Sequence, residues 1–126
     1  MVLSMATWFS ASAVLPVVRD RWELSSTSAS WLTIAVQLGF VVGAVVVAVA
    51  NLADTVAPVR LILAGSLTAA AANLGLLGVS GAGGAIALRF VTGAALAGVY
   101  PPALKAMSTW FRAGRGTALG IMVGAL

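Results

Sequence analysis

The sequence predicts an all-α fold, a polytopic membrane bundle of apolar helices. Hydrophobic residues make up 61% of the chain, charged residues only 8%, and the mean hydropathy is +1.09. A soluble domain normally carries about 25% charged residues to cover its surface. Several apolar runs also approach the ~20 residues that a helix needs to cross a ~30 Å hydrocarbon core. The chain is therefore expected to be an integral membrane protein that contacts the lipid bilayer.

Composition also argues against several classes of function. The chain has no histidine and no cysteine, so it lacks thiol chemistry and the usual zinc ligands, and no metal or cofactor is expected. The acidic residues Asp20, Glu23 and Asp54 all lie outside the apolar runs, which leaves no buried carboxylate pair for acid–base catalysis. An enzyme is not expected. The basic residues are scattered between membrane-length segments, so the positive-inside tendency explains the net charge of +4 better than a nucleic-acid partner does.

The first expected span covers residues 1–18, which are apolar or small throughout. A signal peptide is the alternative interpretation, and it would need a basic start and a shorter apolar core. No basic residue precedes Arg19, and Trp8, Phe9 and Pro16 suit a permanent span. The span is the favoured interpretation.

The second expected span, residues 31–50, follows a polar connector at 19–30 whose serines and threonines are candidate helix N-caps. Gly39 and Gly43 form a small-xxx-small pair that predicts close packing against another helix. Gln37 is the strongly polar side chain of this span. We interpret it as a packing group, with contact to a substrate cavity as the alternative.

A short turn at 51–60 leads into the third expected span at 59–78. Pro58 suits the first turn of that helix, and Asp54 suits the positive helix end. Arg60 can pair with Asp54 or with lipid phosphates. Asn73 is the polar residue of the third span, and its expected role is packing. The glycine-rich stretch that follows, up to Gly84, predicts a tight loop and an antiparallel neighbouring helix.

The fourth expected span, residues 85–106, carries Arg89 near its start and Lys105 near its end, with a break expected at Tyr100-Pro101-Pro102. Lys105 can extend its amine to the membrane surface, which is the expected behaviour of a lysine near a helix end. A charge inside an apolar run marks a candidate functional site. Arg89 is therefore a candidate cavity residue, with extension to the surface as an equal alternative. Gly93 and Ala97 lie near the same helix face and favour the cavity interpretation, because their small side chains leave room beside Arg89. Gly93, Ala97 and Gly98 are also expected to serve in helix packing.

The connector at 107–116 precedes a fifth apolar run, residues 117–126, which is too short to cross a bilayer. Basic residues set the orientation of membrane helices. The turn at 51–60 and the region 105–116 lie on one side and hold Arg60, Lys105, Arg112 and Arg115. This side is expected to be cytoplasmic, which places the N-terminus in the cytoplasm as well.

Three segments of the chain form a recognisable set in this order: Leu52-Ala53-Asp54, Arg89-Phe90 through Gly93, Ala97 and Gly98 to Tyr100-Pro101, and Trp110-Phe111 with Gly114-Arg115-Gly116. Together they resemble the N-terminal half of a major facilitator superfamily transporter. The signature loop of that family has a Leu-Ala-Asp core, its fourth helix an Arg-Phe start with small residues before Tyr-Pro, and its next connector a Trp-Phe pair before Gly-Arg-Gly. The loop departs from the pattern, because Thr55 stands where that family has arginine and Pro58-Val59 where it has a basic pair.

The resemblance implies a partial N-terminal half of a secondary transporter that moves a small solute by alternating access. It implies that Arg89 faces a central cavity and binds an anionic solute or couples to protons. The other candidate cavity residues are Gln37, Asn73 and Tyr100, and Asp54 and Arg60 belong to a cytoplasmic gate loop. By the same analogy, the remaining helices of the full-length permease are required partners, so the chain alone is expected to be inactive. A bacterial inner membrane is the expected location.

Two alternatives stay open at this point. One is a small four-helix exporter that acts as a homodimer, but exporters of that kind carry a glutamate in the first span, and none lies in residues 1–18. The other is a membrane assembly subunit that uses the small-xxx-small faces to bind a partner.

Overall fold

The described residues, 2–21, 23, 25–111 and 114–124 of a computed structural model, fold into helices joined by short turns. The expected all-α helix bundle is confirmed. Its elements are α1 (Val2–Arg21), α2 (Ser26–Val49), α3 (Leu52–Thr55), α4 (Pro58–Gly75), the 3₁₀ turn η1 (Leu76–Gly78), α5 (Ala82–Leu96), α6 (Tyr100–Trp110) and α7 (Arg115–Gly124). Met1, Trp22, Arg112 and the last two residues of the expected fifth run lie outside the described residues.

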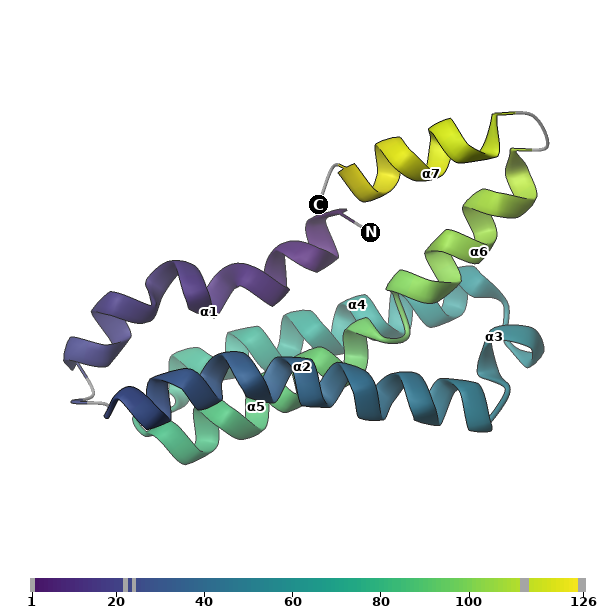
Figure 1. Cartoon of the computed structure of the whole chain (residues 1–126). Coiled ribbons are helices and arrows are strands. Elements are labelled where there is room, and N and C mark those ends of the chain that lie inside the picture. Colours follow the sequence, from purple (N-terminus) through teal and green to yellow (C-terminus); the bar gives the residue numbers. More distant parts are fainter. Residues whose placement is uncertain (1, 22, 24, 112–113, 125–126) are drawn as a thin grey trace.

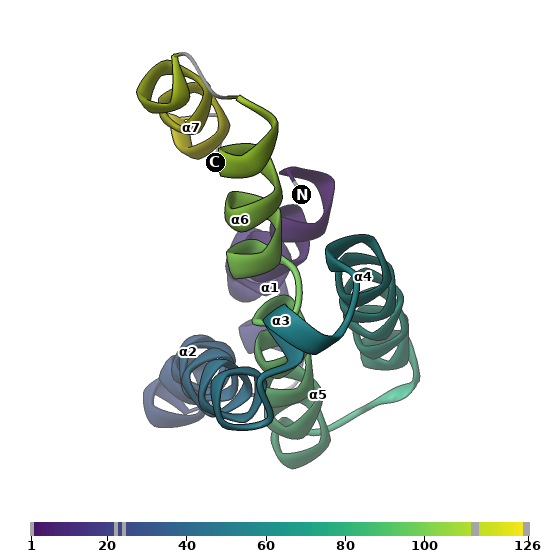
Figure 2. The ribbon, with the colours of Figure 1, turned by 90° about the vertical axis from the view of Figure 1, so that its right-hand side faces the viewer.

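Helix α5 is the central element of the bundle. It packs between α2 and α4, and α1 lies across this group (Figure 2). Helix α6 leaves the end of the bundle that also holds α3, and α7 then reverses the direction of the chain (Figure 1). Every helix that surrounds α5 therefore presents backbone or side-chain groups to the helix that carries Arg89.

Helix α2 begins at Ser26, earlier than the expected start at residue 31. The reason is a cap: the side chain of Ser25 accepts a hydrogen bond from the backbone N–H of Ser28 at 3.1 Å. A serine at this position satisfies one of the free N–H groups of a helix start. The expectation of a cap in the serine- and threonine-rich segment is confirmed, and the expected connector at 19–30 is wrong, because helix continues through Arg21 and resumes at Ser26.

The helix–loop–helix unit of α4 and α5 agrees with the sequence prediction. Pro58 lies in the first turn of α4, and the helix gives way to η1 and then to a loop before α5 starts at Ala82. The two helices pack against each other. The start of α5 precedes the expected residue 85, because two glycines of the predicted loop, Gly83 and Gly84, are helical.

The fourth expected span is interrupted by a break in its helix. Helix α5 ends at Leu96 and α6 begins at Tyr100, with a turn between them. Pro101 and Pro102 have no N–H to donate to residues 97 and 98, so a regular helix cannot run through this point. The interruption was expected at the Tyr-Pro-Pro segment, and it begins just before it. Helix α6 also continues to Trp110, beyond the expected end at residue 106.

The interface between α2 and α5 depends on glycine. A Cβ atom on Gly93 would lie 1.9 Å from the carbonyl oxygen of Val36, and one on Gly39 would lie 2.0 Å from that of Phe90. Both distances are far below van der Waals contact, so the two backbones touch directly. Gly43 faces the backbone of Ala94 in the same way. This arrangement matches the close packing expected from the small-xxx-small pattern.

The other expected packing residues, Ala97 and Gly98, lie in the turn that follows α5. Ala97 is buried, and Gly98 is half-buried with the carbonyl oxygen of Leu61 at 3.7 Å from where its Cβ would lie. The nearby apolar core consists of Ala69, Leu96 and Val99. Trp8 of α1 packs against this core and meets Phe40 of α2 edge-to-face, with ring centroids 5.4 Å apart.

Three helical segments of the described chain are long and apolar enough to cross a membrane: Ser26–Val49, Pro58–Gly78 and Ala82–Trp110. Large apolar side chains on their outer faces are exposed, among them Val45, Val46, Leu63 and Leu67. Apolar outer faces suit a lipid environment, because lipid tails do not penalise apolar surface. The chain is an integral membrane protein.

Two glycines of α5 provide a matched test of this packing. We expect Gly93→Ala to destabilise the protein by about 1–3 kcal/mol, because the added methyl group overpacks a backbone contact. Gly83→Ala, at a position with no atom within 4 Å of the new Cβ, should leave stability unchanged or raise it by about 0.5–1 kcal/mol. Unfolding in detergent micelles measures both. Equal stability of the two variants would contradict the direct backbone contact.

Candidate functional site

The guanidinium of Arg89 lies buried inside the bundle, with the residue only 1% exposed. Its Nη1 donates to the carbonyl oxygen of Thr7 at 2.8 Å, and its Nη2 donates to the carbonyl oxygen of Trp8. Its Nε donates to the carbonyl oxygen of Leu32 at 3.4 Å. Arg89 of α5 is thus bonded to the backbones of α1 and α2.

These three acceptors of Arg89 are backbone carbonyls and not carboxylates. A charge at the centre of an apolar helix disfavours insertion by about 2.5–3.5 kcal/mol on insertion scales, and a hydrogen bond from a charged donor contributes about 1.5–3 kcal/mol. Two or three such hydrogen bonds are sufficient to offset the free-energy cost of inserting the charge. In the described residues Arg89 therefore points into the bundle and does not extend to its surface. Its positive charge has no carboxylate partner there.

A chain of polar side chains continues from Arg89 to α4. Nη1 of Arg89 also donates to Oγ of Ser10 at 3.4 Å, and Oγ of Ser10 lies 2.7 Å from Oδ1 of Asn73. Nδ2 of Asn73 donates to Oγ1 of Thr92 at 3.2 Å. Side chains of α1, α4 and α5 thus form one hydrogen-bonded group around Arg89, and it includes Asn73, one of the candidate residues.

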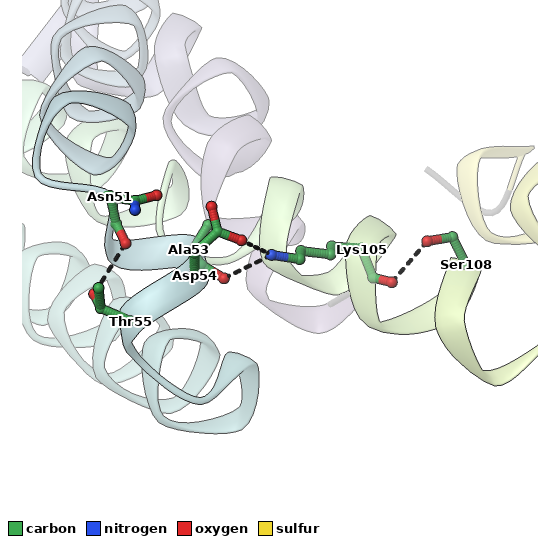
Figure 3. A network of polar contacts seen from close by, with 6 residues as sticks. All are labelled: Asn51, Ala53, Asp54, Thr55, Lys105 and Ser108. Atoms are coloured by element: carbon green, nitrogen blue, oxygen red, sulfur yellow. Dashed lines mark hydrogen bonds and ion pairs between the residues drawn. The ribbon is translucent and has the colours of Figure 1, made fainter.

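A second polar group joins α3 to α6 (Figure 3). Nζ of Lys105 donates to the carbonyl oxygen of Ala53 at 3.0 Å and forms an ion pair with Oδ1 of Asp54. The short helix α3 positions Asp54, and it starts after Asn51, which has a φ of 51°. Asparagine tolerates this left-handed conformation better than most residues. Thr55 closes the turn by donating to the carbonyl oxygen of Asn51 at 2.9 Å.

The partner of Asp54 differs from the one that the sequence suggested. Arg60 is exposed near the start of α4, and Asp54 pairs with Lys105. This pair has no local signal in the sequence, because Lys105 lies 51 residues from Asp54 and its own position predicts a lysine extending to the membrane surface. One signal was available: both residues were expected on the same side of the membrane. The ion pair agrees with that expectation, since it places α3 and the C-terminal half of the α5–α6 segment at one end of the bundle.

The other candidate residues lie apart from Arg89. Gln37 is exposed on α2, so its side chain does not pack into the described bundle, and Tyr100 is half-buried at the start of α6. In the described part of the chain no three histidine, cysteine, aspartate or glutamate side chains are grouped to hold a metal ion. The site is therefore a buried cation and its neutral polar neighbours.

Comparison of the sequence with models of known families identifies the family. The model of the Major Facilitator Superfamily matches residues 1–126. The chain belongs to this family. Members of the superfamily are membrane transporters, so the chain is a transport protein of the membrane rather than a member of an enzyme family. Neither a search of curated proteins nor a search of solved structures found a match.

The ion pair between α3 and α6 can be tested by reversing its charges. We expect Asp54→Lys and Lys105→Asp each to separate α3 from α6, because like charges then face each other, and the double variant to restore the distance. The effect on stability should stay within about 1 kcal/mol, since the side chains of Lys105 and Asp54 are 46% and 62% exposed. Spin labels at Thr55 and Ser108 report the separation.

Arg60→Gln serves as the control for this experiment, and it should leave the distance between the labels unchanged. A change in distance with Arg60→Gln, or no change with either reversal, would contradict the assignment of Lys105 as the partner of Asp54.

Proposed function

We propose that this chain forms the N-terminal part of a permease that moves a small solute across the membrane by alternating access, driven by a coupling ion. One observation carries the proposal: a chain of this family buries an arginine against backbone carbonyls, with no carboxylate partner among the residues that the structure describes. Intramembrane charges generally mark substrate or ion pathways. The remaining helices of the permease complete the site, and the chain alone does not transport.

Arg89 is the residue that we propose to act on the solute. Within the described part of the chain no acidic side chain pairs with it, so an anionic group that approaches α5 is attracted to the guanidinium more strongly than it would be in water. Access requires α1 to release the bonds from Arg89 to Thr7 and Trp8. Binding of the anion is thereby linked to movement of α1, and protons are the proposed coupling ion.

Asp54 and Lys105 form the proposed gate. Asp54 belongs to the loop between two membrane helices, and Lys105 belongs to the helical segment that carries Arg89. An exposed ion pair contributes little to stability, typically below about 1 kcal/mol, so it can open and close at low energetic cost. Arg60 stands next to this loop on the same side. In the proposed orientation this end of the protein and its N-terminus are cytoplasmic, and the membrane is the bacterial inner membrane.

The assembly-subunit alternative receives less support from the packing. It required the faces of Gly39 and Gly43 to bind another protein, and both glycines are buried against α5 within the chain. The homodimeric exporter still lacks a glutamate in its first helix. The permease therefore remains the proposed function.

The proposal predicts a specific response to substitution of Arg89. In the full-length permease, Arg89→Ala should abolish uptake of small organic anions, and Arg89→Lys should retain a measurable fraction because it keeps the charge. Uptake of labelled monocarboxylates and dicarboxylates into proteoliposomes, compared with their uncharged methyl esters, measures this. Gln37→Ala is the comparison variant, because Gln37 is another candidate cavity residue but lies exposed on α2. Uptake by Arg89→Ala at the level of the unsubstituted protein would refute the proposed role.

The proposed orientation predicts opposite labelling of two connectors. A cysteine introduced at Ser26 should react with a membrane-impermeant maleimide from outside the cell, and one at Thr55 should react only after the membrane is opened. The chain has no native cysteine to interfere. Reaction of both cysteines from the outside would overturn the orientation.

A further inference from the structure

Asn73 lies where α1, α4 and α5 meet, and it touches the hydroxyl group that contacts Arg89. We infer that Asn73 is a positioning residue: it holds the Ser10 hydroxyl in the orientation that accepts from Arg89, and so fixes the guanidinium against α1. This inference rests on the proposed role of Arg89 in transport. It gives Asn73 a function distinct from the direct solute contact and the simple packing considered from the sequence.

Hydrogen bonds fix the orientation of the Asn73 amide. Nδ2 donates to the carbonyl oxygen of Ala69 at 2.8 Å, and a carbonyl can only accept. Nδ2 also donates to Thr92 at 3.2 Å. Both amide hydrogens are then used within α4 and α5, and Oδ1 is turned toward α1. There it accepts from the Ser10 hydroxyl at 2.7 Å.

The single hydrogen of the Ser10 hydroxyl has two acceptors within reach. One is Oδ1 of Asn73, and the other is the carbonyl oxygen of Thr7 at 2.8 Å. Arg89 also donates to that Thr7 carbonyl and to the Ser10 oxygen. When the hydrogen points to Asn73, the Thr7 carbonyl is free for Arg89 and the Ser10 lone pairs face the guanidinium. Without Asn73 the hydrogen turns to Thr7 and competes with Arg89 for the same carbonyl.

A second contact between α1 and α4 allows positioning to be separated from simple attachment of the two helices. Oγ of Ser4 and Oγ of Ser66 form a hydrogen bond at 2.8 Å, between the same two helices as the Ser10–Asn73 bond. This pair makes no hydrogen bond to Arg89, whose acceptors are on Thr7, Trp8, Ser10 and Leu32. Ser66→Ala therefore removes a comparable contact without touching the guanidinium.

Chemical labelling of Arg89 tests the inference without knowledge of the solute. The full-length protein in phosphatidylcholine vesicles is treated with phenylglyoxal, and labelling of each arginine is followed by mass spectrometry, with the exposed Arg60 as internal reference. In the unsubstituted protein Arg89 should be protected. Asn73→Leu, which keeps the γ-branched shape of the side chain without its polar atoms, should raise its labelling rate about five-fold, the effect of losing one net hydrogen bond from an opening equilibrium. Asn73→Asp keeps an acceptor for Ser10 and should preserve protection.

Ser10→Ala tests the same inference by removing the hydroxyl group that Asn73 is proposed to orient. It should also raise labelling of Arg89, and Asn73→Leu should add nothing in its background, because both act through one hydroxyl. Ser66→Ala should not change the rate. Unchanged protection in Asn73→Leu, additive effects with Ser10→Ala, or equal exposure in Ser66→Ala would overturn the inference. Because the reagent reports contacts of Arg89 and not solute movement, this failure is distinguishable from a failure of the transport proposal.

Discussion

The centre of this structure is organised by the need of a buried guanidinium for hydrogen-bond acceptors. Arg89 sits in an apolar helix, and every donor that it buries needs an acceptor that is not water. Side-chain acids cannot supply one, because the three in the sequence lie outside the apolar segments. The acceptors are carbonyl oxygens of Thr7, Trp8 and Leu32, each of which has two lone pairs and can accept outside its own helix. The positions of α1 and α2 follow from this need.

The glycine contacts between α2 and α5 make that solution geometrically possible. Gly93 lies one helical turn beyond Arg89, and the backbone of α2 touches α5 at this point. Such an approach brings the Leu32 carbonyl within reach of Nε of Arg89. Larger residues would separate the two backbones and leave the bond unmade. On the opposite side, Asn73 and Thr92 add neutral polar groups without adding charge. The result is a cation in which each guanidinium nitrogen donates a hydrogen bond and which no carboxylate of the described residues neutralises, and the proposed transport function uses this property.

Features with a local physical cause were predictable from the sequence, and features that depend on distant backbone atoms were not. Apolar length predicted the helices, Gly39 and Gly93 predicted close packing, and the prolines after Tyr100 predicted the break in the fourth span. The start of α2 was misplaced because the Ser25 cap carries helix into a polar segment. The acceptors of Arg89 were beyond prediction, since any residue type supplies a carbonyl. The partner of Asp54 was missed because the tertiary fold, and not the loop sequence, brings Lys105 to it.

The central claim is that the Arg89 guanidinium bonds to the backbone of α1 within the membrane. Solid-state nuclear magnetic resonance on the protein in lipid bilayers tests it directly, with ¹⁵N-labelled arginine side chains and ¹³C-labelled carbonyls of Thr7 and Trp8. Dipolar dephasing between these nuclei, with none between Arg89 and the lipid ³¹P, is the predicted result. Dephasing of the Arg89 nitrogens by lipid ³¹P, without coupling to the two carbonyls, would show an arginine that extends to the membrane surface and would contradict the claim.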